Sequence, residues 1–161
     1  MNMARPNEAL LRALRETADR LEGGAIFRWT HMGSCNCGHL AQTVTRLSAA
    51  DIHRRALERS GDWTDQSIEY CGATGYAMDH VFEHLLELGL TTGDLADLER
   101  LSGDDVLRTL PPGQRELDKR KREDVVLYLR RWADVLAWRL ASGRAIEDVA
   151  AKGAARVPAR A

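Results

Sequence analysis

The stretch EDVVLYLRRWADVLAWRLA, residues 123–141, carries the strongest helical pattern in the chain. Its apolar residues recur at spacings of three and four, which places a set of them on one face of a helix. The pattern predicts a helix from about Glu116 to Ala141 that ends at Gly143, with Trp138 packed inside. Its expected buried stripe consists of Val125, Leu129, Trp132, Ala133, Leu136 and Leu140.

Shorter helices are expected upstream of this segment. Ser48 to Asp51, Thr91 to Asp94 and Ser102 to Asp105 each read as a capping box that opens a helix. Ser34 or Asn36 is the expected N-cap of the helix predicted at about residues 37–47. The predicted helices before the last one cover about residues 6–22, 37–47, 48–60, 76–88, 91–101 and 102–110.

The pattern therefore predicts an all-α fold, a single-domain bundle of about six or seven helices. At most a short strand is expected, near residues 25–30, where Ile26, Phe27 and Trp29 form an apolar segment. A chain of 161 residues has the length of one domain. We assign residues 1–150 to a single helical domain and residues 151–161 to a frayed or disordered tail.

Composition narrows the classes of function. The chain is 44% hydrophobic and 29% charged with a formal net charge of -1, as in a globular protein without a global attraction to nucleic acid. No apolar run approaches the length of a membrane span, and residues 1–7 lack a secretory signal. We therefore expect a cytoplasmic protein with no membrane partner and no nucleic-acid partner. A protein partner or a homo-oligomer stays open.

The residues typical of metal sites gather between His31 and His84. This window contains all three cysteines and all five histidines of the chain. Thiolate and imidazole are donors that zinc, iron and copper prefer, and histidines four residues apart share one side of a helix. We predict a site for a metal ion, zinc or iron, held by Cys35, Cys37, Cys71 and one or both of His80 and His84, with His39 as a reserve ligand.

The segment His80-Val-Phe-Glu83-His84 also matches the pattern H-x-x-E-H. In enzymes with this pattern two histidines hold zinc and the glutamate is the general base. Glu83 is therefore the candidate catalytic residue, if the metal keeps an open coordination position. Four closed protein ligands would instead indicate a structural ion.

A second hypothesis is a thiol-dependent hydrolase or transferase. Cys35 and Cys37 precede a predicted helix, whose N-terminal amides and dipole stabilise a thiolate. The string Asn-Cys-Gly-His-Leu-Ala-Gln, residues 36–42, resembles the nucleophile turn of papain-like and NlpC-type peptidases. That resemblance implies a nucleophile at Cys37. Those families carry the partner histidine on a strand, whereas this chain has almost no predicted strands after residue 42.

A third hypothesis is a helical interaction or regulatory module without chemistry. Its support is the charged run Asp118-Lys-Arg-Lys-Arg-Glu-Asp124, followed by Arg130 and Arg131. Mixed charge of this kind is also typical of an ordinary solvated helix surface.

Overall fold

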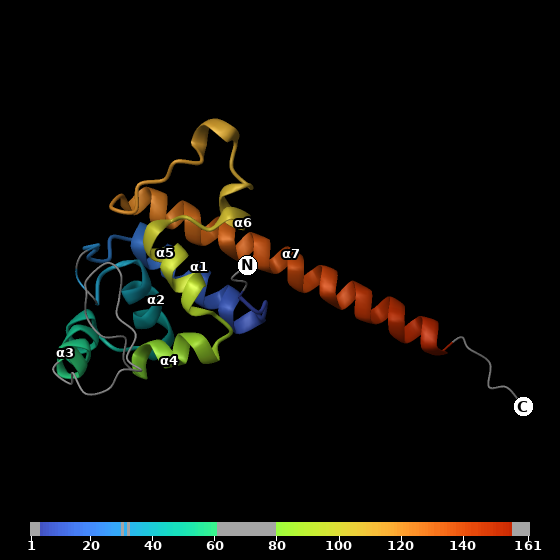
Figure 1. Cartoon of the computed structure of the whole chain (residues 1–161), viewed down its shortest axis with the longest axis horizontal. Helices are drawn as coiled ribbons and strands as arrows, with labels where there is room; N and C mark the ends of the chain where they lie inside the picture. The colour runs from blue at the N-terminus through green and yellow to red at the C-terminus, as the bar shows by residue number, and fades with distance from the viewer. Residues whose placement is uncertain (1–3, 30, 32, 61–79, 156–161) are drawn as a thin grey trace, which may run out of the picture.

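The computed structural model describes residues 4–29, 31, 33–60 and 80–155 (Figure 1). Within these residues there are seven α-helices, one 3-10 turn and no strand. The predicted all-α fold is confirmed. The helices are α1 (Glu8–Glu22), α2 (Asn36–Thr45), α3 (Ala49–Ser60), α4 (His80–Glu87), α5 (Thr92–Arg100), α6 (Asp104–Leu107) and α7 (Arg122–Ala155), with the 3-10 turn at Pro112–Gln114.

Two helices organise the packing. Helix α1 lies along α7 on one side and against α2 on the other (Figure 1). Helix α2, although short, also contacts α3, α4 and α5. Because four helices surround α2, its first six residues are all buried. This is the segment that carries Cys37 and His39, so these two predicted ligands lie in the interior of the domain.

Helix α1 follows its sequence pattern closely. Asn7 is the N-cap, and its side-chain oxygen accepts a hydrogen bond of 2.9 Å from the backbone N–H of Leu10. Its amide nitrogen donates to the carbonyl of Leu88, 2.7 Å away, and so ties the start of α1 to the end of α4. Gly23 is the C-cap. The buried face consists of Leu10, Leu11, Ala13, Leu14, Thr17, Ala18 and Leu21.

Helix α7 differs from the prediction at both ends. It begins at Arg122 rather than at Glu116, because the Asp124 carboxylate accepts a hydrogen bond of 2.7 Å from the backbone N–H of Asp118 and closes the preceding loop. It continues past Gly143 to Ala155, and the predicted stop at Gly143 is wrong. A glycine inside a helix costs only about 1 kcal/mol relative to alanine, so a long helix tolerates one. The first residues of the predicted tail, 151–155, therefore belong to α7; residues 156–161 lie outside the described part.

The two tryptophans predicted to pack inside α7 have opposite environments. Trp132 is buried, whereas Trp138 is 71% exposed. The six residue steps from Trp132 to Trp138 turn the helix by about 600°, so the second indole points away from the face that carries the first. The predicted burial of Trp138 is wrong.

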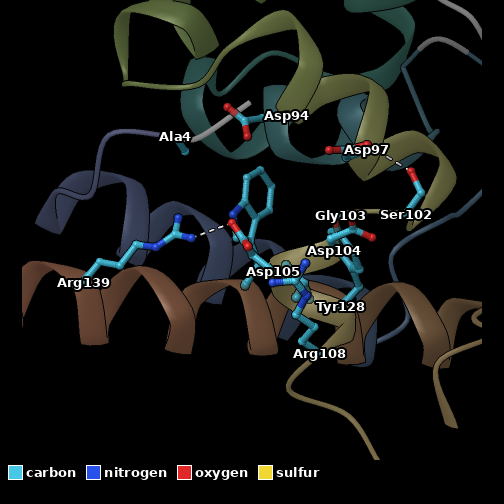
Figure 2. Close-up of a pocket in the computed structure, with 12 residues that line it drawn as sticks. Ala4, Asp94, Asp97, Ser102, Gly103, Asp104, Asp105, Arg108, Tyr128 and Arg139 are labelled. Carbon is cyan, nitrogen blue, oxygen red and sulfur yellow. Dashed lines mark hydrogen bonds and ion pairs between the residues drawn. The ribbon is translucent and has the colours of Figure 1, made fainter. Parts of the chain in front are cut away.

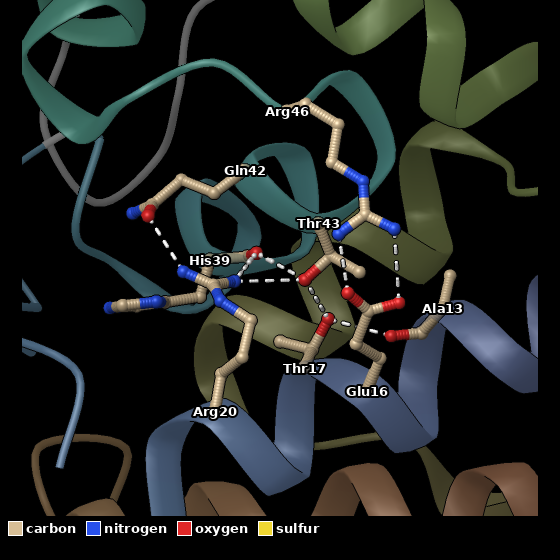
Figure 3. Close-up of polar contacts among 8 residues, drawn as sticks. All are labelled: Ala13, Glu16, Thr17, Arg20, His39, Gln42, Thr43 and Arg46. Carbon is tan, nitrogen blue, oxygen red and sulfur yellow. Dashed lines mark hydrogen bonds and ion pairs between the residues drawn. The ribbon is translucent and has the colours of Figure 1, made fainter. Parts of the chain in front are cut away.

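Polar side chains connect α1 to α2 through the otherwise apolar core (Figure 3). The hydroxyls of Thr17 and Thr43 are 2.7 Å apart and buried. Arg20 donates to the hydroxyl of Thr43 at 2.9 Å, to the carbonyl of His39 at 3.1 Å and to the side-chain oxygen of Gln42 at 2.7 Å. This network fixes the position of α2 along α1.

The capping predictions have mixed outcomes. The box at Thr91 and Asp94 is present, with both reciprocal hydrogen bonds. Ser48 also accepts from the backbone N–H of Asp51, at 3.1 Å. The predicted cap at Ser102 is wrong: Gly103 is the N-cap of α6, and the Ser102 hydroxyl donates to Asp97 instead, at 3.1 Å.

The remaining predictions concern residues 25–30 and 61–79. Residues 25–29 form no strand and serve as an irregular connector. Residues 61–79 lie outside the described part of the chain, and with them the first residues of the helix predicted at 76–88, whose described part is α4. None of the helices in the described part of the chain is long and apolar enough to cross a membrane.

Candidate functional site

Cys35 begins α2. Its backbone is extended, and its sulfur accepts a hydrogen bond from the backbone N–H of Gly38, 3.4 Å away. The thiol therefore occupies the N-cap position that the sequence assigned to Ser34 or Asn36, and that assignment is wrong. An N-cap must place an acceptor near the unpaired amides of the first turn, and a thiol at the right backbone position does so. Cys35 is fully buried.

Cys37 lies in the first turn of the same helix and faces α5. Its thiol donates a hydrogen bond to the carbonyl of Leu95, 3.2 Å away. Its backbone N–H donates to Oε1 of Glu99 at 2.7 Å.

Glu99 is the acidic member of the site, and we did not predict it from the sequence. Burial raises the pKa of its carboxyl group, while hydrogen bonds from the Cys37 backbone N–H and from the thiols of Cys35 and Cys37 lower it. A carboxyl group and two thiols thus share one buried space. The signal was present: Glu99 lies four residues after Leu95, on the apolar face of α5.

The ends of α2 and α5 meet at this cluster with complementary dipoles. The side-chain amide of Asn36 donates to the carbonyls of Leu98 and Glu99, at 3.1 and 3.2 Å. The indole N–H of Trp29 donates to the same Glu99 carbonyl at 2.9 Å. The positive N-terminus of α2 therefore faces the negative C-terminus of α5. Lys119 lies 4.4 Å from the centre of the Trp29 ring and covers it.

His39, the reserve ligand, points to a different part of the core. Its Nε2 atom lies 2.7 Å from the carbonyl oxygen of Ile26 and its ring contacts Phe27. Burial lowers the pKa of His39 to about 4, so the ring is neutral at pH 7 and donates to Ile26. The structure gives His39 a role in holding the 25–29 connector against α2.

A second histidine pair lies beside the start of α2. The rings of His31 and His53 are stacked with centroids 4.1 Å apart, which joins the loop before α2 to α3. Burial is the main cause that lowers the pKa of His31, and the neighbouring His53 and Arg28 lower it further. Gly33, in the same loop, passes so close to Ala49 that an added Cβ would meet its carbonyl oxygen at 1.9 Å.

The H-x-x-E-H segment lies on α4. His84 is exposed and its Nδ1 atom is 3.8 Å from Glu87, and the Glu83 side chain is exposed too. The side chain of His80 and all of Cys71 lie outside the described residues. Among the side chains that the structure describes, no three of the His, Cys, Asp and Glu type are grouped so that one metal ion could be held. Cys35 and Cys37 are the two predicted ligands that share a neighbour, Glu99.

A separate pocket of about 170 Å³ lies between α5, α6 and α7. Asp97, Asp105, Tyr128 and Arg139 are among the residues that line it (Figure 2). Its polar groups pair with one another: Arg139 binds Asp105 at 2.5 Å, and Asp97 accepts from Ser102. These internal pairs give the pocket a structural role in joining α6 to α7.

No protein-family model, no curated protein and no solved structure matches this chain. Cys35, Cys37 and Glu99 together form a buried thiol–carboxyl cluster.

Proposed function

We propose that the protein binds a thiophilic metal ion, zinc or iron, through Cys35 and Cys37 at the thiol–carboxyl cluster. The observation that carries the proposal is the pair of buried thiols at one helix N-terminus beside one buried carboxyl group. Two thiolates with a carboxylate nearby are a donor set that attracts a divalent cation.

Electrostatics favours a metal over a free nucleophile at this position. A thiolate next to a carboxylate in a buried space is disfavoured by charge repulsion and by desolvation. A bound cation removes both penalties, because it takes the place of the thiol protons and balances the charge of Glu99. Glu99 is then a positioning residue that holds the Cys37 backbone through its Oε1 atom.

Further ligands are needed to complete the coordination. Cys71 and His80 stay predictions for these positions. His39 is less suited because its Nε2 atom already bonds to Ile26, and His84 because it is exposed beside Glu87. A closed set of four ligands would give the ion a structural role. An open position would let the metal activate water, with Glu83 as the predicted general base.

The experiment is a metal analysis of the full chain purified without an affinity tag. We expect about one equivalent of zinc or iron per chain. Cys35→Ser is the informative variant, because serine is a good N-cap but a poor ligand for a thiophilic ion. It should lose the metal while the metal-free chain keeps its stability. Cys37→Ser should do the same, since a hydroxyl can still donate to Leu95.

Two further variants locate the site. Glu99→Gln should lower metal affinity by about 10- to 100-fold, the usual effect of a residue that orients a ligand. His84→Ala, on the exposed side of α4, should keep the metal and serves as the matched control. Loss of metal in His84→Ala with retention in Cys35→Ser would overturn the assignment. So would a wild-type chain that takes up no metal when zinc or ferrous iron is added under reducing conditions.

Thiol chemistry is the second candidate, and one observation favours it. The hydrogen bond from Gly38 N–H to the Cys35 sulfur is of the kind that stabilises a thiolate. This alternative predicts rapid, single-site alkylation of Cys35 at neutral pH in metal-free protein. Under the metal proposal, alkylation of the wild-type chain is slow until a chelator is added.

A further inference from the structure

Helix α7 has a second apolar face that none of the described residues cover. Trp138, Ile146 and Val149 are 71%, 69% and 71% exposed. Ser142 and Ala145 lie between them, so the series 138, 142, 145, 149 alternates spacings of four and three residues. This is the spacing of a helix that packs along another helix. We call residues 138, 142, 145, 146, 149 and 153 the outer face of α7.

The outer face lies on the opposite side of α7 from the core. At about 100° per residue, its centre is roughly 150° around the helix from the stripe that packs on α1. The C-terminal part of α7 also runs beyond the other helices (Figure 1). A projecting helix of this length is only marginally stable in water unless its apolar face is packed. A cluster of exposed apolar residues that includes a tryptophan is typical of an interface.

We propose that the outer face of α7 pairs with the outer face of a second copy of this chain, in antiparallel orientation. The sequence of the face is complementary to itself in that orientation. With the two-fold axis between Ala145 and Ile146, Trp138 faces the partner's Gly153, and Val149 faces the partner's Ser142. Large side chains thus meet small ones, which lets the helices approach closely.

A parallel pair would instead place each large side chain of the face beside its own copy, Trp138 against the partner's Trp138 and Val149 against the partner's Val149. The antiparallel orientation avoids this crowding.

The first test is the mass of the full chain by sedimentation equilibrium, from about 1 μM to about 1 mM, the range expected for a small interface. We expect a monomer that becomes a dimer within this range. Val149→Asp should move the midpoint to at least about tenfold higher concentration, since it places a charge in the centre of the interface. Ile26→Asp is the matched control, because Ile26 is equally exposed, at 72%, but lies outside the outer face.

The orientation is tested separately by cysteine cross-linking. In the antiparallel pair Ala145→Cys lies next to its own copy, whereas Ser142→Cys lies next to position 149. Ala145→Cys should therefore form a disulfide-linked dimer by itself. Ser142→Cys should do so only when mixed with Val149→Cys. A parallel pair would link each of the three variants to itself, and wild-type chain gives the background from the native cysteines.

A chain that stays monomeric at about 1 mM overturns the proposal. So does equal dimerisation of Val149→Asp and wild type, or a monomer whose outer face binds neutral lipid vesicles instead. None of these results depends on the metal content of the thiol–carboxyl cluster.

Discussion

The backbone N–H of Cys37 and the carboxylate of Glu99 form a hydrogen bond of 2.7 Å that joins the first turn of α2 to the last turn of α5. The same carboxylate lies beside both thiols of the candidate site. The Glu99 side chain therefore takes part both in the packing of α2 against α5 and in the candidate site. A change in its protonation should change the free energy of unfolding of the domain.

Glu99→Gln should change how stability depends on pH in metal-free protein. Because burial raises the pKa of Glu99 in the folded state, the folded chain holds its proton more tightly than the unfolded chain. Wild-type stability is then highest below the unfolded pKa, about 4.5, and falls as pH rises toward the folded pKa, by about 1.4 kcal/mol per unit of difference. Urea unfolding at several pH values, with a chelator present, should show a flatter profile for the variant. Parallel profiles would contradict a raised pKa.

His39→Gln tests the opposite shift. The pKa of His39 is lowered from 6.5 to about 4, so the folded state favours the neutral ring. Wild-type stability from this group is complete above pH 6.5 and is lost as pH falls toward 4, by on the order of 2 to 3 kcal/mol. Glutamine does not titrate and can still donate to the Ile26 carbonyl. Thermal melts at pH 7.5 and pH 5 should therefore differ less in the variant than in wild type.

Gly33→Ala should be strongly destabilising. The new Cβ would lie 1.9 Å from the backbone oxygen of Ala49, and a backbone atom cannot move aside as a flexible side chain can. Separating the loop from α3 should cost at least about 2 kcal/mol in urea unfolding. Gly113→Ala is the control, since no heavy atom lies within 4 Å of its added Cβ. Equal stabilities for the two variants would mean that the loop is not packed against α3.

The Thr17 and Thr43 hydroxyls should be coupled energetically. Thr43→Val removes one hydrogen bond from Arg20, which keeps its bonds to the His39 carbonyl and to Gln42, and one contact from Thr17, which keeps its bond to the Ala13 carbonyl. The variant should therefore cost about 0.5 to 1.5 kcal/mol. Thr17→Val removes the other hydroxyl of the pair. The double variant should cost less than the sum of the single variants, by about 0.5 kcal/mol or more, in a double-mutant cycle. Strict additivity would show that the two hydroxyls do not interact.

The sequence alone was sufficient for the fold class and for most of the core. Periodicity located the buried face of α1 and of α7, because burial of an apolar stripe is the main force that forms both helices. Local periodicity did not locate the ends of α7. The helix starts where the Asp124 side chain accepts a hydrogen bond from the backbone of Asp118 across a loop. It continues through Gly143 because a single glycine costs a helix little free energy.

The candidate site was predicted only in part. Spacing identified Cys35 and Cys37, since both stand at a helix start. The position of Glu99 on the apolar face of α5 could have marked it as buried, but its partner Cys37 lies 62 positions away along the chain, so no local pattern linked the two. Trp138 was placed inside because an apolar residue at helical spacing is usually buried. Periodicity cannot distinguish a face that meets the core from one that faces solvent.

The packing of α1 on α7 has a consequence for synthesis of the chain. The two helices are joined by contacts between opposite ends of the sequence, such as Arg122 donating to the Leu21 carbonyl and Arg130 to Asp19. During synthesis α1 leaves the ribosome before α7 is made. The apolar face of α1 therefore stays without its α7 contacts while about a hundred residues are added. The nascent chain is thus an unfinished bundle that depends on its last helix, and a ribosome stalled before Arg122 should hold a protease-sensitive chain.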